Sequence, residues 1–141
     1  MHNEPIRRFR DLDHAKQLLA EWQERLFLQH WIIKLDLENE PVVHDGNRLL
    51  GLWSGAISQH ECDIKLFNGD DEFVDESCIK WSAEHVLVHE LLHCKYNFLN
   101  LDLNFSSNKY FDLHEHALIE QMAKSLIMAK YDIKFDWFKN F

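Results

Sequence analysis

The stretch SAEHVLVHELLHCKYN, residues 82–97, sets three histidines and two glutamates among Val and Leu residues. Its length and apolar content predict a helix, and a helix interior has no spare backbone groups to satisfy buried polar side chains. At about 100° per residue, His89 and His93 lie roughly 40° apart on one helical face. Both imidazoles can therefore reach one metal ion, or the polar stripe is simply solvated. Glu90 lies about 100° round from His89, where it can reach a water on such an ion.

This spacing is the H-E-x-x-H pattern, in which two histidines bind zinc and the glutamate acts as a general base. Zinc accepts neutral imidazole ligands and lowers the pKa of a bound water to about 7, and a nearby carboxylate takes the proton as the water attacks a carbonyl. The sequence therefore predicts one Zn²⁺ per chain, held by His89 and His93, with Glu90 as the catalytic base.

A catalytic zinc site needs a third protein ligand, and residues 112–130 offer several. On a helical wheel, four apolar residues fall within about 60° of Glu115: Leu118, Ile119, Met122 and Leu126. A carboxylate in the middle of an apolar face needs a partner, and a zinc ion on the neighbouring helix supplies one. We therefore predict Glu115 as the third ligand, with Glu120 as the alternative. His114 and His116 lie about 100° to either side of Glu115 and are weaker candidates.

Composition limits the class of protein. A chain of 141 residues is expected to form one domain, 1–141, with a core that needs no disulfide. The formal net charge of −9 argues against nucleic acid or an anionic membrane as the main partner. No secretory signal or membrane-spanning stretch is visible. Three cysteines without framework spacing, Cys62, Cys78 and Cys94, favour a reducing, cytoplasmic location. The oligomeric state stays open.

Hydrophobic periodicity predicts an α+β domain. Asp11 or Asp13 can cap the first helix, and Ser82 can cap the second. The expected elements, in chain order, are a helix over 15–26, a strand over 31–38, a hairpin turn at Asp45-Gly46, short strands over 55–59 and 62–67, helices over about 80–98 and 111–130, and an aromatic tail over 131–141 that packs back onto the body.

Three segments carry a family resemblance: LLAEWQERLFLQHWIIKL (18–35), EHVLVHELLHC (84–94) and LHEHALIEQMAKSL (113–126). Together they resemble the small zincin-like metallopeptidases of phages and prophages, relatives of the His-Glu-His-plus-Glu zinc peptidases called gluzincins. The resemblance covers roughly 13–127, and only the zinc motif in it is specific. Related chains often carry two acidic residues where this chain has Glu115-His116, which leaves the third ligand open.

The resemblance also implies a layout and a substrate. The layout is an N-terminal helix, a small twisted mixed sheet, an active-site helix and a ligand-bearing C-terminal helix. The edge strand facing the cleft would be ECDIKLFN, residues 61–68, and a peptide or protein substrate would add to it as an extra strand.

Three functions fit the motif. The first is a zinc metallopeptidase, and the second is a non-catalytic zinc-binding sensor or interaction module. The third is a DNA-repair protease of the SprT class, which uses a third histidine and needs a basic DNA-binding segment that a charge of −9 argues against. Peptide deformylases add a cysteine ligand, but neither Cys62 nor Cys78 stands in their Gly-Cys-Leu-Ser setting.

Three nearby residues are given structural roles. His85 and His93 lie about 12 Å apart along the helix axis, so His85 is expected at the edge of the cleft or on the surface. Cys94 points about 100° away from His93 and is expected to be a buried thiol. Tyr110 is expected to be a packed loop residue, with oxyanion binding as the alternative.

Overall fold

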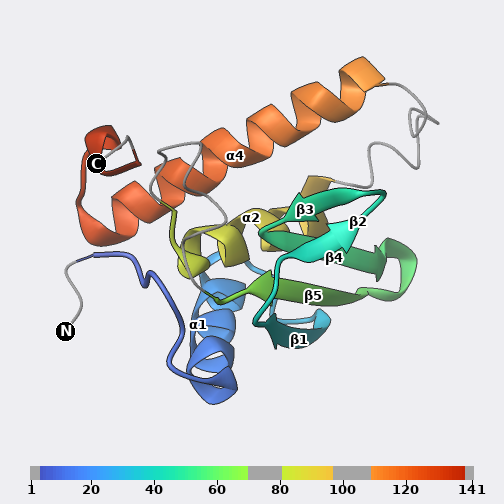
Figure 1. Cartoon of the computed structure of the whole chain (residues 1–141), viewed down its shortest axis with the longest axis horizontal. Helices are drawn as coiled ribbons and strands as arrows, with labels where there is room; N and C mark the ends of the chain where they lie inside the picture. Colours follow the sequence, from blue (N-terminus) through green and yellow to red (C-terminus); the bar gives the residue numbers. More distant parts are fainter. Residues whose placement is uncertain (1–3, 70–80, 97–108, 139–141) are drawn as a thin grey trace.

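Helices α1, α2 and α4 gather beside a small mixed sheet, which confirms the α+β class (Figure 1). This computed structural model describes residues 4–69, 81–96 and 109–138, with side chains from residue 114 onward in the last range. Cys78, the side chain of Tyr110 and most of the acidic stretch 69–76 lie outside the described residues. The elements are α1 (Leu12–Arg25), β1 (Ile32–Glu38), β2 (Val42–His44), β3 (Asn47–Leu49), β4 (Gly51–Ala56), β5 (Glu61–Phe67), α2 (Ala83–Tyr96), α4 (Lys109–Tyr131) and the 3₁₀ turns Ile57–Gln59 and Phe135–Phe138.

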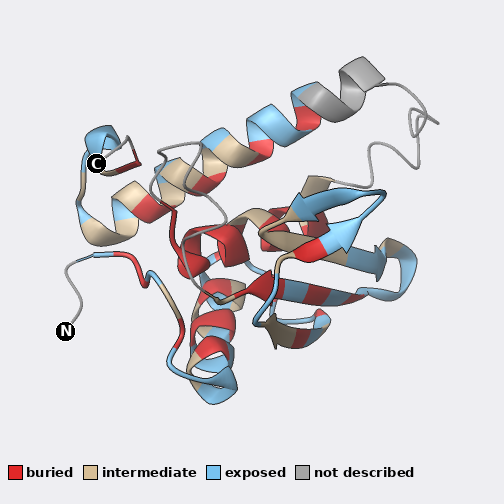
Figure 2. Ribbon diagram, in the orientation of Figure 1, coloured by how far each residue is buried: buried red, intermediate tan, exposed pale blue. Residues whose placement is uncertain are grey.

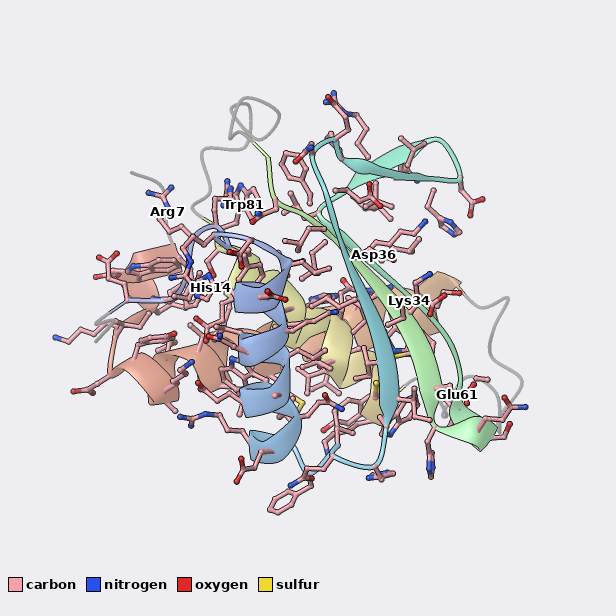
Figure 3. The ribbon with its side chains drawn as sticks, turned by 90° about the horizontal axis from the view of Figure 1, so that it is seen from below. Arg7, His14, Lys34, Asp36, Glu61 and Trp81 are labelled. Carbon is pink, nitrogen blue, oxygen red and sulfur yellow. The ribbon has the colours of Figure 1, made fainter. Side chains whose placement is uncertain are left out.

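The strand β5 lies in the centre of the three-stranded sheet, whose order is β1-β5-β4. It pairs in parallel with β1 and antiparallel with β4. The expectation that residues 61–68 form the edge strand is therefore wrong, and β4 is the edge on the α2 side. Figure 3 shows the sheet from another direction, with Lys34 and Asp36 on β1. The central place of β5 is consistent with its alternating burial, because Cys62, Ile64 and Leu66 all point into the core.

The short strands follow the turn signals in most places. Asp45 and Gly46 connect β2 to β3 with φ angles of 52° and 80°, the left-handed conformation that a tight hairpin turn requires. The expected strand over 55–59 is replaced by the end of β4 and a 3₁₀ turn. His60 closes that turn with a φ of 54° and an N–H bond to the carbonyl of Ile57, so the chain turns there before it enters β5.

The helix α2 is buried on almost every side, because eleven of its 14 residues are buried (Figure 2). It packs against α1, α4, β4 and β5. Its start is fixed by Ser82, whose hydroxyl accepts from the N–H of His85 at 2.9 Å, as the sequence predicts for a cap. Two further N–H groups of the first turn, those of Ala83 and Glu84, donate to carbonyls of the N-terminal segment. Asp11 caps α1 in the same way by accepting from the N–H of His14.

Glu84, at the start of α2, is a fully buried carboxylate with four donors. It accepts from the N–H of Ile6 at 2.9 Å and from the indole of Trp22 at 2.8 Å. From the end of α4 it accepts from Lys130 at 2.6 Å and from the hydroxyl of Tyr131. Burial and this carboxylate raise the pKa of Tyr131 well above its usual range, so the phenol keeps the proton that it donates. One carboxylate thus joins the N-terminal segment, α1 and α4 to the start of α2.

The C-terminal tail packs back onto the body, as the sequence predicts. Phe138 is buried, and its ring contacts those of His85 and Trp137. No helix within the described ranges has both the length and the apolar composition needed to cross a membrane.

We expect Glu84→Gln to lower the free energy of unfolding by about 3 kcal/mol. The substitution keeps the shape of the side chain but removes its charge. It also replaces one accepting oxygen with an amide NH₂ group, which would face groups that are themselves donors. Glu24→Gln, an exposed change on α1, is the matched control and should cost less than about 0.5 kcal/mol. Urea denaturation followed by circular dichroism measures both, and equal stability of the two variants would contradict the role given to Glu84.

Candidate metal centre

Three imidazoles from two helices meet at one place. His89 and His93 come from α2 and His116 comes from α4, and one ligand atom from each lies within 4.8 Å of the others. The ring centroids of His93 and His116 are 5.2 Å apart, and those of His89 and His93 are 5.3 Å apart. Ligand atoms around one tetrahedral zinc ion are about 3.4 Å apart, so small rotations of the side chains bring these nitrogens onto a single ion. The donor set therefore fits a metal.

Glu120 supports the histidines from the side. Its carboxylate oxygen Oε2 lies 3.6 Å from Nδ1 of His89, and the other oxygen contacts Nε2 of His85. A carboxylate on one ring nitrogen orients the imidazole and leaves the other nitrogen for a metal. Burial alone would raise the pKa of Glu120, but the two imidazoles hold it well below its usual range. For His89, burial lowers the pKa, and the contact with Glu120 and the charge of Glu90 outweigh this and raise it.

Glu90 is buried beside this group, with Oε1 3.9 Å from Nε2 of His93. Burial raises the pKa of Glu90 to about 7, and the charge of Glu120 adds to this while that of His89 opposes it. A carboxyl group with a pKa near neutrality can both accept and release a proton under physiological conditions. Glu90 is therefore placed and tuned to exchange a proton with a group that enters the cavity beside it.

The backbone of β4 passes directly over Glu90 at Gly51. A Cβ built on Gly51 would lie 3.0 Å from Oε2 of Glu90 and 2.7 Å from a methyl group of Val86. The absence of a side chain thus lets the edge strand approach the α2 face that carries Glu90. This close approach is one reason why the carboxyl group is shielded from water.

A cavity of about 690 Å³ opens over the three imidazoles. Its walls are formed by α2 and α4, by β4 and by the β2–β3 hairpin, which contributes His44 and Arg48. Leu52, Trp53 and Trp81 add apolar surface, so the cavity combines an apolar wall with a polar floor. A concave site of this size and composition is typical of small-molecule or peptide binding.

Glu115 lies on the buried face of α4, as the helical wheel predicts, and it lines the same cavity. Ile119, one turn along, is fully buried. Among the described residues, however, the group able to hold an ion contains His116 and not Glu115. The role of Glu115 as a ligand stays a prediction, and the geometry favours its neighbour.

His116, a weaker candidate in the sequence, is the α4 residue whose ligand atom lies close to those of His89 and His93. The wheel places it on the flank of α4, and its side chain is largely exposed, so the apolar stripe gives no sign of it. A better signal is the spacing of polar residues: His116 and Glu120 repeat at one turn on α4, as His89 and His93 do on α2. Two helices that cross with these stripes facing each other bring the polar side chains together.

The remaining sequence predictions near the motif have clear outcomes. His85 is buried rather than at the surface, and it lines the cavity with Nε2 against Glu120. Cys94 is a buried thiol, as predicted, and its Sγ accepts from the indole of Trp53 at 3.4 Å. Cys62 lies against Cys94 and is not in the metal-binding group of the described residues.

A comparison with curated proteins finds similarity to the mitochondrial inner membrane protease ATP23 of Lodderomyces elongisporus. The two are 30% identical over 120 residues, which cover 81% of this chain and 43% of that protein. The chain thus spans less than half the length of this relative. No protein family and no solved structure matches the chain. The similarity supports a zincin-like protease in general and gives no support to a phage or prophage type.

We expect Gly51→Ala to lower the free energy of unfolding by about 1–3 kcal/mol, because the new methyl group overpacks the contact with Val86 and Glu90. Ser54→Ala, an exposed change on the same strand, is the matched control and should be nearly neutral. The double variant Gly51→Ala, Val86→Ala removes the methyl group in closest contact, so it should lose less stability than the sum of the two single changes. Thermal unfolding measures each variant, and a neutral Gly51→Ala would contradict the close packing of β4 on Glu90.

Proposed function

We propose that this chain is a zinc-dependent metallopeptidase that hydrolyses peptide bonds with Glu90 as general base. The observation that carries the proposal is the convergence of His89, His93 and His116 beside a buried carboxylate whose pKa is near 7. These groups line a cavity large enough for a peptide segment. The similarity to a protease agrees with this reaction class.

The roles of the residues follow from their positions. When bound, zinc would act as a Lewis acid that polarises the substrate carbonyl and lowers the pKa of a water. Glu90 accepts a proton from the attacking water and returns it to the leaving amine, for which its pKa is suited. Glu120 holds the ring of His89 in one orientation.

The third ligand in this proposal is His116. The resemblance to gluzincins implies a glutamate from the C-terminal helix, and Glu115 occupies the buried face there. His116 is favoured because its ring centroid is 5.2 Å from that of His93 and 5.9 Å from that of His89. Glu115 then acts as a polar wall of the cavity, and Glu120 as the partner of the ligand His89.

The substrate is proposed to bind along β4. This strand is one of the two edges of the three-stranded sheet, and its residues Gly51, Leu52 and Trp53 line the cavity beside Glu90. An extended peptide that pairs with a sheet edge gains backbone hydrogen bonds whatever its sequence, and pockets then select the side chains. The proposed substrate-binding edge is therefore Gly51–Ala56, in place of residues 61–68, which the sequence suggested.

A non-catalytic zinc-binding sensor is the competing function. Such a site is expected to be closed by four protein ligands, whereas a catalytic zinc site has three and keeps one position open. The group found among the described residues has three members and faces a cavity, which favours catalysis.

The first experiment tests the ligand set. The purified protein should bind one zinc ion per chain, which a chelator removes. His116→Ala should weaken zinc binding more than any other α4 variant, because it removes a ligand atom. Glu120→Gln should weaken binding by roughly 10–100-fold, as the loss of an orienting partner does. Competition with a chromogenic chelator measures each affinity.

Two variants serve as controls for this series. His114→Ala changes an exposed histidine two positions from His116 and should bind zinc as the wild type does. Glu115→Gln should have a smaller effect than His116→Ala. If Glu115→Gln abolishes binding and His116→Ala does not, the third ligand is Glu115. Full zinc occupancy in His93→Ala would mean that the site lies elsewhere.

The second experiment tests the role of Glu90. Glu90→Gln is nearly isosteric, so zinc content should be almost unchanged, but the proton acceptor is lost. Peptide hydrolysis should therefore fall by about 10²–10⁴-fold. Incubation with a diverse library of unfolded peptides, read by mass spectrometry with and without chelator, measures the cleavage.

Glu61→Gln, an exposed change on β5, is the control and should cleave at the wild-type rate. Chelator-sensitive cleavage at equal rates in the wild type and Glu90→Gln would rule out the base assignment. Zinc binding without cleavage by any of the proteins would favour the sensor function.

A further inference from the structure

Two cysteines from distant parts of the chain touch behind the candidate metal centre. Cys62 lies on β5 and Cys94 on α2, 32 positions apart, and their sulfur atoms are 3.9 Å from each other. Both thiols are free and buried. They contact each other directly across the interface between the central strand and the helix that carries the H-E-x-x-H motif.

The surroundings hold both sulfur atoms in place. The indole N–H of Trp53 donates to Sγ of Cys94 at 3.4 Å. Gly55 stands opposite Cys62 in the β4–β5 ladder, and a Cβ there would come within 2.8 Å of the Trp53 ring and within 2.6 Å of Cys62 Cβ. The glycine therefore leaves the space that lets the indole reach Cys94. The pair is fixed from β4, β5 and α2 together.

We propose that Cys62 and Cys94 are a redox modification site that forms a reversible intramolecular disulfide. The sulfur atoms need to approach by about 1.9 Å to reach the bond length of a disulfide. A small disulfide such as glutathione disulfide is the oxidant. One cysteine thiolate attacks it, forms a mixed disulfide and releases one glutathione, and the second cysteine then displaces the other glutathione. Two cysteine thiols are thereby oxidised, and one glutathione disulfide is reduced to two glutathione molecules. The two protons of the cysteine thiols end on the two glutathione thiols.

The bond would join β5 to α2 without using the metal-binding face. Cys94 follows His93 directly, and at about 100° per residue its side chain points to a different side of the helix. Oxidation should therefore leave the imidazoles of His89 and His93 in place. It should instead restrict the unfolded chain, because it closes a loop of 32 positions. This inference does not depend on the proposed peptidase activity.

The test uses the full chain in its folded state. The protein is equilibrated with glutathione disulfide, its remaining thiols are alkylated, and its peptides are mapped by mass spectrometry without reduction. We expect a cross-linked peptide pair that contains Cys62 and Cys94, with a mass two hydrogen atoms below the sum of the free peptides. Dithiothreitol should reverse it. The oxidised protein should unfold at a temperature roughly 10 °C higher than the reduced protein.

Matched variants identify the pair. Cys78→Ser should form the same cross-link, whereas Cys62→Ser should not. Peptide mapping of the wild type decides the pairing by itself if Cys62→Ser fails to fold. Cross-links that involve Cys78 in place of Cys62 or Cys94 would overturn the proposal. So would two alkylated thiols at Cys62 and Cys94 after prolonged oxidation, or a melting temperature that oxidation leaves unchanged or lowers.

Discussion

The buried carboxylate of Glu84 is the contact on which the arrangement of helices depends. It lies at the start of α2 and binds the N-terminal segment at Ile6, α1 at Trp22, and the end of α4 at Lys130 and Tyr131. A buried charge is costly unless its partners are in place, so these elements have to be docked together before the carboxylate is satisfied. The direction of α4 across α2 is thereby set at one end, and the facing histidines lie farther along the same two helices.

The helix α2 is buried on nearly every side, and beyond Glu84 its polar groups gather along one stripe. His85, His89 and His93 follow that stripe, and Glu90 lies next to it. Each of these groups would be unfavourable alone in a buried helix, and each has a polar neighbour: Glu120 for the first two histidines, and the imidazole group for Glu90. The opposite flank of the helix is closed by Cys94 against β5. Beyond Glu84 in the first turn, the buried polar side chains of α2 lie on the side that faces the cavity.

The tertiary structure corrected one sequence prediction and changed the preferred candidate in another, and both differences have the same physical cause. The sequence identified strands but not their neighbours, so β5 was taken for an edge although β1 and β4 cover both its sides. It identified the buried face of α4 but not the angle at which α4 crosses α2, so Glu115 was preferred over His116. Strand order and crossing angle depend on side chains far apart in the chain, which periodicity within one element does not report.

The sequence by itself determined the α+β class, the order of the helices, the caps at Asp11 and Ser82, the turn at Asp45-Gly46 and the burial of Cys94. These features depend on local rules. The hydrophobic period identifies the helices and strands, a side-chain oxygen caps a helix start, Asp-Gly adopts the left-handed turn, and the angle per residue places Cys94 on the packed side of its helix. Only the tertiary structure brought His116 to the α2 histidines, Gly51 over Glu90 and the two buried thiols into contact. Each of these contacts joins separate elements, so it depends on packing across the whole core and not on any single stretch of sequence.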